Sequence, residues 1–502
     1  MASLRRNLTA NYIGRTWTAL LGIALIPVYI KFMGSEAYGL VGFFATLSNV
    51  FGILDVGIAS TMNRELARRS VNSELVGSQR DLVRTFEVIY WGIAISVGVI
   101  IILIAPYIAN TWLKTQDINS TAALRAIQLM GIAIAFQFPG SLYQSGLIGM
   151  QKQVLVNAIL IITGTFRGLG VILFLWLVSP TIQTFFAWQV VMSIVGSLVF
   201  LVAIWSNLPK AVHRARFRKD IVDDVWKYSA AIGVSALIGI SLTQFDKVIL
   251  SKMLSLKLFA YYSIATTVAS SIWMIIFPFN IAIFPHLVQL HENNQKEEFR
   301  LQFHRSSQLL SFLLLPVSAI LILFSKKILL LWIKDPLIVE NAHLILSLLV
   351  FGNMLNGIVM IPASSAKAFG WPLLQTYTNL IQAIVIVPLL ICMVYWLQGI
   401  GASIVWILIN STYIVIMVPL FFRRFLREEQ KNWYLQDILK PVLAAFSICT
   451  FSLIIVPAMN SSYAILGWIM VTGIIAIITT GLSLPHVRNI FNQGWIKGRI
   501  KI

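Results

Sequence analysis

The chain has 502 residues, of which 58% are hydrophobic and only 11% are charged, and its formal net charge is +19. A soluble globular chain carries about 25% charged residues. This composition therefore excludes a soluble enzyme and predicts an all-α membrane protein that crosses the bilayer many times. The basic residues lie between apolar stretches and form no aromatic-interleaved patch, so nucleic acid is not expected as a partner.

Apolar stretches recur along the whole chain, each close to the roughly 20 residues that a helix needs to cross a bilayer. We expect about 14 transmembrane helices, at residues 11–31, 38–62, 84–106, 122–148, 154–178, 183–206, 227–250, 258–289, 306–324, 338–362, 370–396, 399–422, 441–459 and 463–484. The first stretch follows a basic head but has no small-residue cleavage site. We therefore expect it to be a retained span and not a signal peptide.

The distribution of basic residues predicts the orientation of these spans. If the N-terminus is cytoplasmic, 27 of the 38 lysines and arginines fall in inside segments and 8 in outside segments. Cytoplasmic loops carry the excess of basic residues in membrane proteins. We therefore expect both termini in the cytoplasm, with membrane lipids as partners of the basic loops.

Two basic loops, at 207–227 and 423–440, divide the spans into groups of six, six and two. They predict a six-helix bundle over residues 1–206, a second over 207–422 and a final helix pair over 423–502. The turns that begin at Tyr29 and Ile249 are similar, about 220 residues apart, which favours a parallel repeat about the membrane normal.

The span at 154–178 holds Arg167 near its centre and no acid. A charge at this depth is costly and usually faces a watery cavity or a partner. The functional interpretation is a cavity that handles an anionic substrate. The structural alternative is an arginine that donates to carbonyl oxygens or pairs with Asp55.

Residues 31–68 carry a Gly–x–x–x–Tyr–Gly turn at Gly34–Gly39 and an Asp–x–Gly ending at Asp55–Gly57, followed by Asn63–Arg64–Glu65. This segment resembles the N-terminal signature of bacterial polysaccharide (O-antigen type) flippases, which belong to the multidrug/oligosaccharidyl-lipid/polysaccharide exporter superfamily. Residues 244–247 and 261–263 are also similar to that family. Leu254 and Phe259–Ala260 depart from it, because they stand where glycines are usual.

The resemblance implies two six-helix bundles around a central cavity, plus two C-terminal helices. It implies alternating-access flipping of an undecaprenyl-diphosphate-linked oligosaccharide across the bacterial inner membrane for O-antigen or another surface polysaccharide. A polysaccharide polymerase and a chain-length regulator would then be partners. Arg167 is the leading candidate for the diphosphate, since arginine binds phosphate through paired hydrogen bonds.

Four further charged residues are candidate site residues. Arg15 in the first span either meets the substrate or reaches the lipid headgroups. Asp55 either pairs with Arg15 or couples transport to an ion. Asp246 and Lys247 lie near the outer end of the seventh span, and neighbouring residues do not share a helix face.

Amides within spans, such as Asn353, Asn356 and Asn379, either link helices or bind sugar hydroxyls, and we favour helix links. Two alternative functions stay open: a cation-coupled multidrug exporter of the same superfamily, and a membrane polymerase or ligase. An exporter of cationic drugs would need deep carboxylates where this chain has arginines. No long outer loop, metal-ligand spacing or cofactor motif supports an enzyme, so none is expected.

Overall fold

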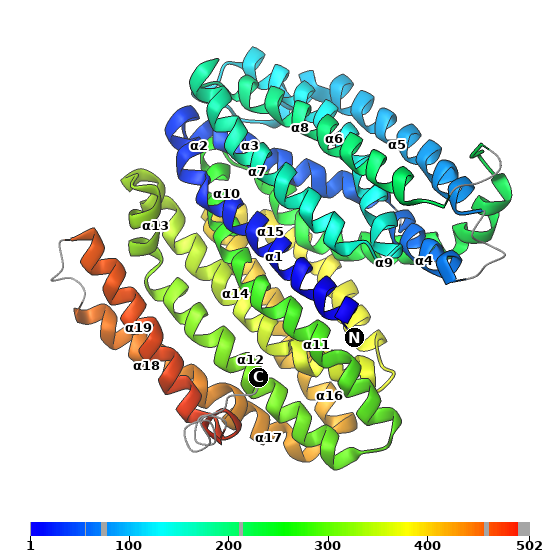
Figure 1. Ribbon diagram of the computed structural model, residues 1–502. Coiled ribbons are helices and arrows are strands. Elements are labelled where there is room, and N and C mark those ends of the chain that lie inside the picture. Colours follow the sequence, from blue (N-terminus) through cyan, green and yellow to red (C-terminus); the bar gives the residue numbers. More distant parts are fainter. Residues whose placement is uncertain (1, 56, 72–77, 210–213, 456–460, 490–502) are drawn as a thin grey trace. The chain divides into compact units, whose positions relative to one another are not determined.

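A computed structural model describes residues 2–55, 57–71, 78–209, 214–455 and 461–489 (Figure 1). The described part of the chain is almost entirely helical and contains no β-strand. It separates into two compact units, Met1–Ala260 and Tyr261–Ile502. This division rests on the density of contacts alone. The three-part organisation with boundaries at 206/207 and 422/423 therefore stays a prediction.

Among the described residues, 11 helices are long and apolar enough to cross a membrane, which confirms an all-α multi-pass membrane protein. Three expected spans account for the difference from 14. The spans at 38–62 and 227–250 fall on helices outside these 11. The spans at 370–396 and 399–422 are counted together as one stretch, Leu373–Phe425. Within it two helices meet at a kink, where Gln398 adopts a φ of 52°.

The first unit contains long helices that lie against one another. Its elements are α1 (Ala2–Ala24), α2 (Ile26–Met33), α3 (Ser35–Phe51), η1 (Gly52–Asp55), α4 (Ile58–Val71), α5 (Gln79–Tyr107), η3 (Ile108–Trp112), α6 (Ser120–Gly149), α7 (Gln153–Leu177), α8 (Ile182–Asn207) and α9 (Lys219–Met253). The unit ends within α10 (Leu256–Ala269). Helices α5, α6 and α8 run side by side in Figure 1, and α1 packs along α7.

The second unit contains η4 (Ser270–Ile272), α11 (Trp273–Glu292), α12 (Lys296–Leu323), α13 (Ser325–Ile333), α14 (Pro336–Ala368), α15 (Leu373–Thr412), η5 (Tyr413–Met417), α16 (Val418–Phe425), η6 (Arg427–Glu429), α17 (Gln430–Asn432), η7 (Trp433–Leu439), α18 (Lys440–Ile455) and α19 (Ser462–Ser483). Helices α18 and α19 form an adjacent pair, and both pack on α12 (Figure 1).

The Gly–x–x–x–Tyr–Gly turn has a structural explanation in the first unit. Gly34 lies between α2 and α3 with a φ of 83°, a conformation that side chains disfavour. Gly39 faces the Leu256 carbonyl oxygen, which a β-carbon at residue 39 would approach to 2.4 Å. The buried Glu36 carboxylate accepts hydrogen bonds from the backbone N–H groups of Gln116 (2.6 Å) and Asp117 (2.5 Å). The motif therefore fixes a tight junction of three chain segments.

Amide side chains link helices in both units, as the sequence favoured. Asn157 of α7 donates to Asn11 of α1 at 2.6 Å. In the second unit, Asn356 of α14 donates to Asn410 of α15 at 2.6 Å, and Asn353 accepts from Trp406 at 3.0 Å. These bonds satisfy polar groups within apolar helices, where no water is at hand.

Replacing Gly39 by alanine tests the close approach of α3 to Leu256. The added methyl group would lie 2.4 Å from a backbone oxygen, so one segment must shift. We expect a loss of about 1–3 kcal/mol of stability, measured as a lower unfolding temperature of the purified protein in detergent. Gly22→Ala is the matched control, because a β-carbon there meets nothing within 4 Å. Equal unfolding temperatures for the two variants would contradict this account.

Candidate functional site

A cavity of about 300 Å³ lies inside the first unit, between α1, α6, α7 and α8. Its lining is mostly small and polar, and it holds one charged residue, Arg167. The complete lining is Thr18, Gln137, Gly140, Ser141, Gln144, Leu160, Thr163, Gly164, Arg167, Ser193, Gly196, Ser197 and Phe200. No acid is among these residues, so the cavity is positively charged.

The position of Arg167 follows from how α7 packs. Gly164 and Gly168 let α1 approach α7 closely, because a β-carbon at either site would lie within 3.4 Å of Thr18, Leu21 or Leu25. On the α8 side, Gly170 leaves room for the Trp188 ring. Arg167 lies within this run of glycines, so the two neighbouring helices frame its side chain.

The Arg167 guanidinium is partly buried and has little compensation. Its hydrogen bond to a described residue is a long one, 3.4 Å from Nη2 to the Met192 carbonyl oxygen. No carboxylate among the described residues pairs with it, and Asp55 has other partners. A cation with so few partners within a membrane helix is well suited to bind an anion.

Asp55 has a structural role at the break between α3 and α4. Its Oδ1 atom accepts hydrogen bonds from the Ala59 N–H at 2.9 Å and from the Tyr90 hydroxyl. The first of these caps the N-terminus of α4. Gly57, with a φ of 71°, makes the turn. The Asp–x–Gly motif is therefore a helix break whose exposed N–H groups are capped by the motif's own aspartate.

The other predicted site residues lie outside this cavity or cannot be placed in it. Asp246 and Lys247 of α9 contact each other, with 3.5 Å between Lys247 Nζ and Asp246 Oδ1, and Lys247 also donates to the Thr243 carbonyl oxygen. Neither residue lines the Arg167 cavity. Arg15 lies on α1, but its side chain is not among those described, so its pairing with Asp55 stays a prediction.

Several lining residues were not predicted from the sequence, above all Gln137, Ser141 and Gln144 of α6. Their spacing of i, i+4 and i+7 places them on one face of a helix. That spacing of polar residues within the apolar span at 122–148 is the signal that could have identified this wall of the cavity.

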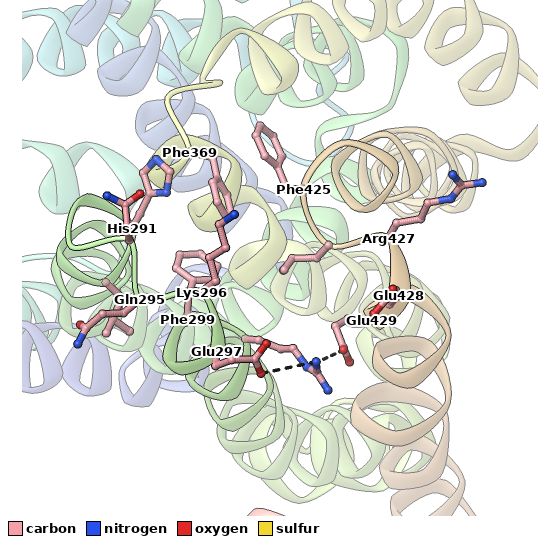
Figure 2. A pocket seen from close by; sticks show the side chains of 14 residues that line it. His291, Gln295, Lys296, Glu297, Phe299, Phe369, Phe425, Arg427, Glu428 and Glu429 are labelled. Carbon is pink, nitrogen blue, oxygen red and sulfur yellow. Dashed lines mark ion pairs between the residues drawn. The ribbon is translucent and has the colours of Figure 1, made fainter.

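The second unit has its own cavity of about 420 Å³, lined by the ends of α11, α12 and α16 and by η6 (Figure 2). Arg300, Glu297 and Glu429 form ion pairs in this cavity. Arg300 contacts Glu429 at 2.6 Å and Glu297 at 3.7 Å, the two ion pairs drawn in Figure 2. Its aromatic rings pack on one another: Phe369 and Phe425 are stacked, with 4.4 Å between their ring centroids. These ion pairs and ring contacts connect α12 with the segment that contains α16 and η6.

A neighbouring polar cluster fastens the C-terminal helices to α12. His304 lies between two carboxylates, with Nδ1 2.5 Å from Asp437 and Nε2 2.9 Å from Glu429. Asp437 also accepts from Gln308 at 2.8 Å and is completely buried. Among the described residues, no group of three or more His, Cys, Asp or Glu side chains is placed to hold a metal ion.

Comparison with known proteins agrees with this architecture. The sequence pattern of the polysaccharide biosynthesis protein family matches residues 4–291, and that of the MatE family matches residues 231–393. A putative O-antigen transporter of Shigella flexneri is 23% identical over 408 residues, which cover 80% of this chain and 94% of that protein.

Two solved structures share the fold at low sequence identity. The lipid II flippase MurJ, in an inward closed conformation, has a TM-score of 0.69 and 15% identity, covering 98% of this chain and 99% of that one. An inward-facing multidrug resistance MATE family transporter has a TM-score of 0.68 and 12% identity, covering 83% and 96%.

The helical fold and the cationic cavity define a multi-pass membrane protein of the transporter class. The chain belongs to the polysaccharide biosynthesis protein family, within the multidrug/oligosaccharidyl-lipid/polysaccharide exporter superfamily.

Replacing Arg167 by methionine tests whether this residue serves binding or folding. Methionine fills similar space and removes a charge that no described carboxylate compensates. We therefore expect the unfolding temperature in detergent to stay the same or rise. A clear fall would instead show that the guanidinium holds helices α7 and α8 together.

Asp437→Ala should have the opposite effect on stability. It leaves Gln308 without its carboxylate acceptor and His304 with Glu429 alone, so we expect a loss of about 1–3 kcal/mol, as for a buried group that loses its hydrogen-bond partner. The measurement is again the unfolding temperature in detergent, with Glu340→Ala as the matched control. Glu340 also has a basic partner, Lys326, but the pair is exposed. If Asp437→Ala lowers the unfolding temperature no more than Glu340→Ala does, Asp437 does not hold these segments together.

Proposed function

We propose that this chain is a flippase that moves an undecaprenyl-diphosphate-linked oligosaccharide across the bacterial inner membrane by alternating access. The repeat unit would serve the synthesis of O-antigen or another surface polysaccharide. The observation that carries the proposal is the cationic cavity around Arg167, which has no acid in its lining. The membership of the chain in the polysaccharide biosynthesis protein family supports it.

In this proposal Arg167 binds the diphosphate. Its guanidinium presents several N–H donors in a fixed plane that matches phosphate oxygens. The long hydrogen bond to Met192 is weak enough to be exchanged for a phosphate oxygen. A cavity of about 300 Å³ is at the lower limit for small-molecule sites. It would therefore receive the phosphate-bearing part of the lipid-linked glycan and not the whole repeat unit.

Arg15 would provide a second cation in the same unit. It stands three residues before the cavity residue Thr18 in the sequence of α1. The proposed orientation has both termini in the cytoplasm, as the distribution of basic residues favours. In this pathway a polysaccharide polymerase and a chain-length regulator would act on the flipped product.

The second candidate is a cation-coupled multidrug exporter, which the MatE family match and the MATE-like fold favour. The cavity lining argues against it, because a cationic drug would meet Arg167 and no carboxylate. Asp246 is compensated by Lys247. Drug resistance conferred by expression of the chain, with no effect on surface polysaccharide, would favour this alternative.

The export function can be tested in cells that depend on this chain. Deletion should abolish surface polysaccharide and cause the lipid-linked precursor to accumulate. Complementation with Arg167→Gln should reduce export about 10- to 100-fold, the range expected for the loss of a hydrogen bond to a charged group. Arg167→Lys should restore part of it, because it keeps the charge but not the paired donors.

The matched control is Arg125→Gln, which removes an exposed arginine of α6 that does not line the cavity. Its export should equal that of the unaltered chain. Normal surface polysaccharide in the deletion strain would contradict the flippase proposal. Full export by Arg167→Gln would contradict the role of this residue in it.

A further inference from the structure

The cavity in the first unit has an elongated lining that three helices form in the same way. Each contributes residues spaced over two turns of one helix face. These residues are Gln137, Ser141 and Gln144 on α6, Leu160, Thr163, Gly164 and Arg167 on α7, and Ser193, Ser197 and Phe200 on α8.

The hydrogen bonds define which residues lie at each end. Gln137 donates to Ser193 at 3.0 Å, and Arg167 donates to the carbonyl oxygen of the adjacent residue, Met192. These contacts place one end of the cavity at Arg167. Gln144 lies seven residues after Gln137 on α6, and Leu160 lies seven residues before Arg167 on α7. At 1.5 Å per residue, the second end is about 10 Å from the first along the helix axis.

Several hydroxyl groups of the lining donate to carbonyl oxygens of their own helices, whereas the buried Ser197 hydroxyl has no partner among the described residues. The hydroxyl of Ser193 donates to the Gln189 carbonyl oxygen, that of Ser141 to Phe138 and that of Thr163 to Ile159. Gln144 is different. Within the described part of the chain its amide has no hydrogen-bond partner, although it lines the cavity and is partly buried. Such an amide can both donate and accept.

The surroundings of Gln144 indicate what it would bind. Phe200 and Leu160 provide apolar surface at the same end, and no charged residue lines it. A sugar ring offers both kinds of contact, hydroxyl groups for an amide and C–H groups for an apolar surface. No carboxylate is among the described lining residues of this end, so nothing there would attract a cationic group.

We propose that the cavity has two subsites: an anion subsite at Arg167, and a sugar-hydroxyl subsite about 10 Å away, where Gln144 determines specificity. The ligand class is therefore a phosphate joined to a hydroxylated ring, with the ring held against Gln144, Leu160 and Phe200. This inference rests on the proposed function, since it assigns a second part of the same ligand to the same cavity.

The test measures binding of two soluble probes to the full chain in lipid nanodiscs by isothermal titration calorimetry. Methyl phosphate probes the anion subsite alone, and a hexose 1-phosphate probes both. The unaltered chain should bind the hexose 1-phosphate more tightly. Gln144→Leu should weaken hexose 1-phosphate binding about three- to tenfold, as for one or two lost hydrogen bonds, and leave methyl phosphate binding unchanged.

The matched control is Gln128→Leu, the same substitution on the same helix at a residue that does not line the cavity. It should change the binding of neither probe. Equal weakening of both probes by Gln144→Leu, no weakening of either, or no preference of the unaltered chain for the hexose 1-phosphate would overturn the inference.

Arg167→Gln separates this inference from the proposed function. It should weaken both probes, because both carry the phosphate. If it does so while Gln144→Leu has no effect, the anion subsite stands and only the sugar subsite fails. If Arg167→Gln weakens neither probe, the anion site on which the proposed function rests has failed.

Discussion

An arginine within an apolar helix, without a described carboxylate partner, is the constraint on which the first unit depends. Insertion scales put the cost of such a residue at the helix centre at about 2.5–3.5 kcal/mol. The surrounding sequence reduces that cost by geometry. Glycines at 164, 168 and 170 draw α1 and α8 close to α7, and the lining of hydroxyls and amides gives the guanidinium a polar surrounding. The charge therefore depends on the cavity that it faces, and the cavity owes its positive charge to this arginine.

Arg167 and the polar cluster of the second unit differ in whether their charges have partners. In the first unit Arg167 is left with one weak hydrogen bond, so its capacity to bind an anion is retained. In the second unit Arg300, His304, Glu429 and Asp437 neutralise one another and attach the C-terminal segment to α12. Removal of Arg167 should leave stability unchanged or raise it, whereas removal of a paired charge should lower it. The reason is that only the removal of a paired charge leaves a partner behind. Burial of a charge is thus not itself a sign of function; the absence of a partner is.

Much of the fold could be predicted from the sequence, because apolar length and the positions of basic residues report directly on the bilayer. The separation of the spans at 370–396 and 399–422 agrees with the kink at Gln398, where two helices meet. Arg167 could be recognised from its depth alone. Gln137, Ser141 and Gln144 were not, because single polar residues in a span are common and only a shared helix face gives them meaning. The partners of Asp55 were equally out of reach, because Tyr90 approaches it only once α5 is packed.

The cavity-lining face of α6, with Gln137, Ser141 and Gln144, has a consequence for how such proteins diverge. The opposite face of this helix carries Leu142 and Tyr143, which are completely buried in the core of the first unit. Substitutions at core positions are disfavoured, because a change in side-chain volume disturbs the surrounding packing. The lining positions contact open space, so their side chains can be exchanged at small cost to the fold. Under the proposed function, a single helix keeps architecture and selectivity on separate faces, and a lineage could acquire new cargo by changing one face while inheriting the other intact.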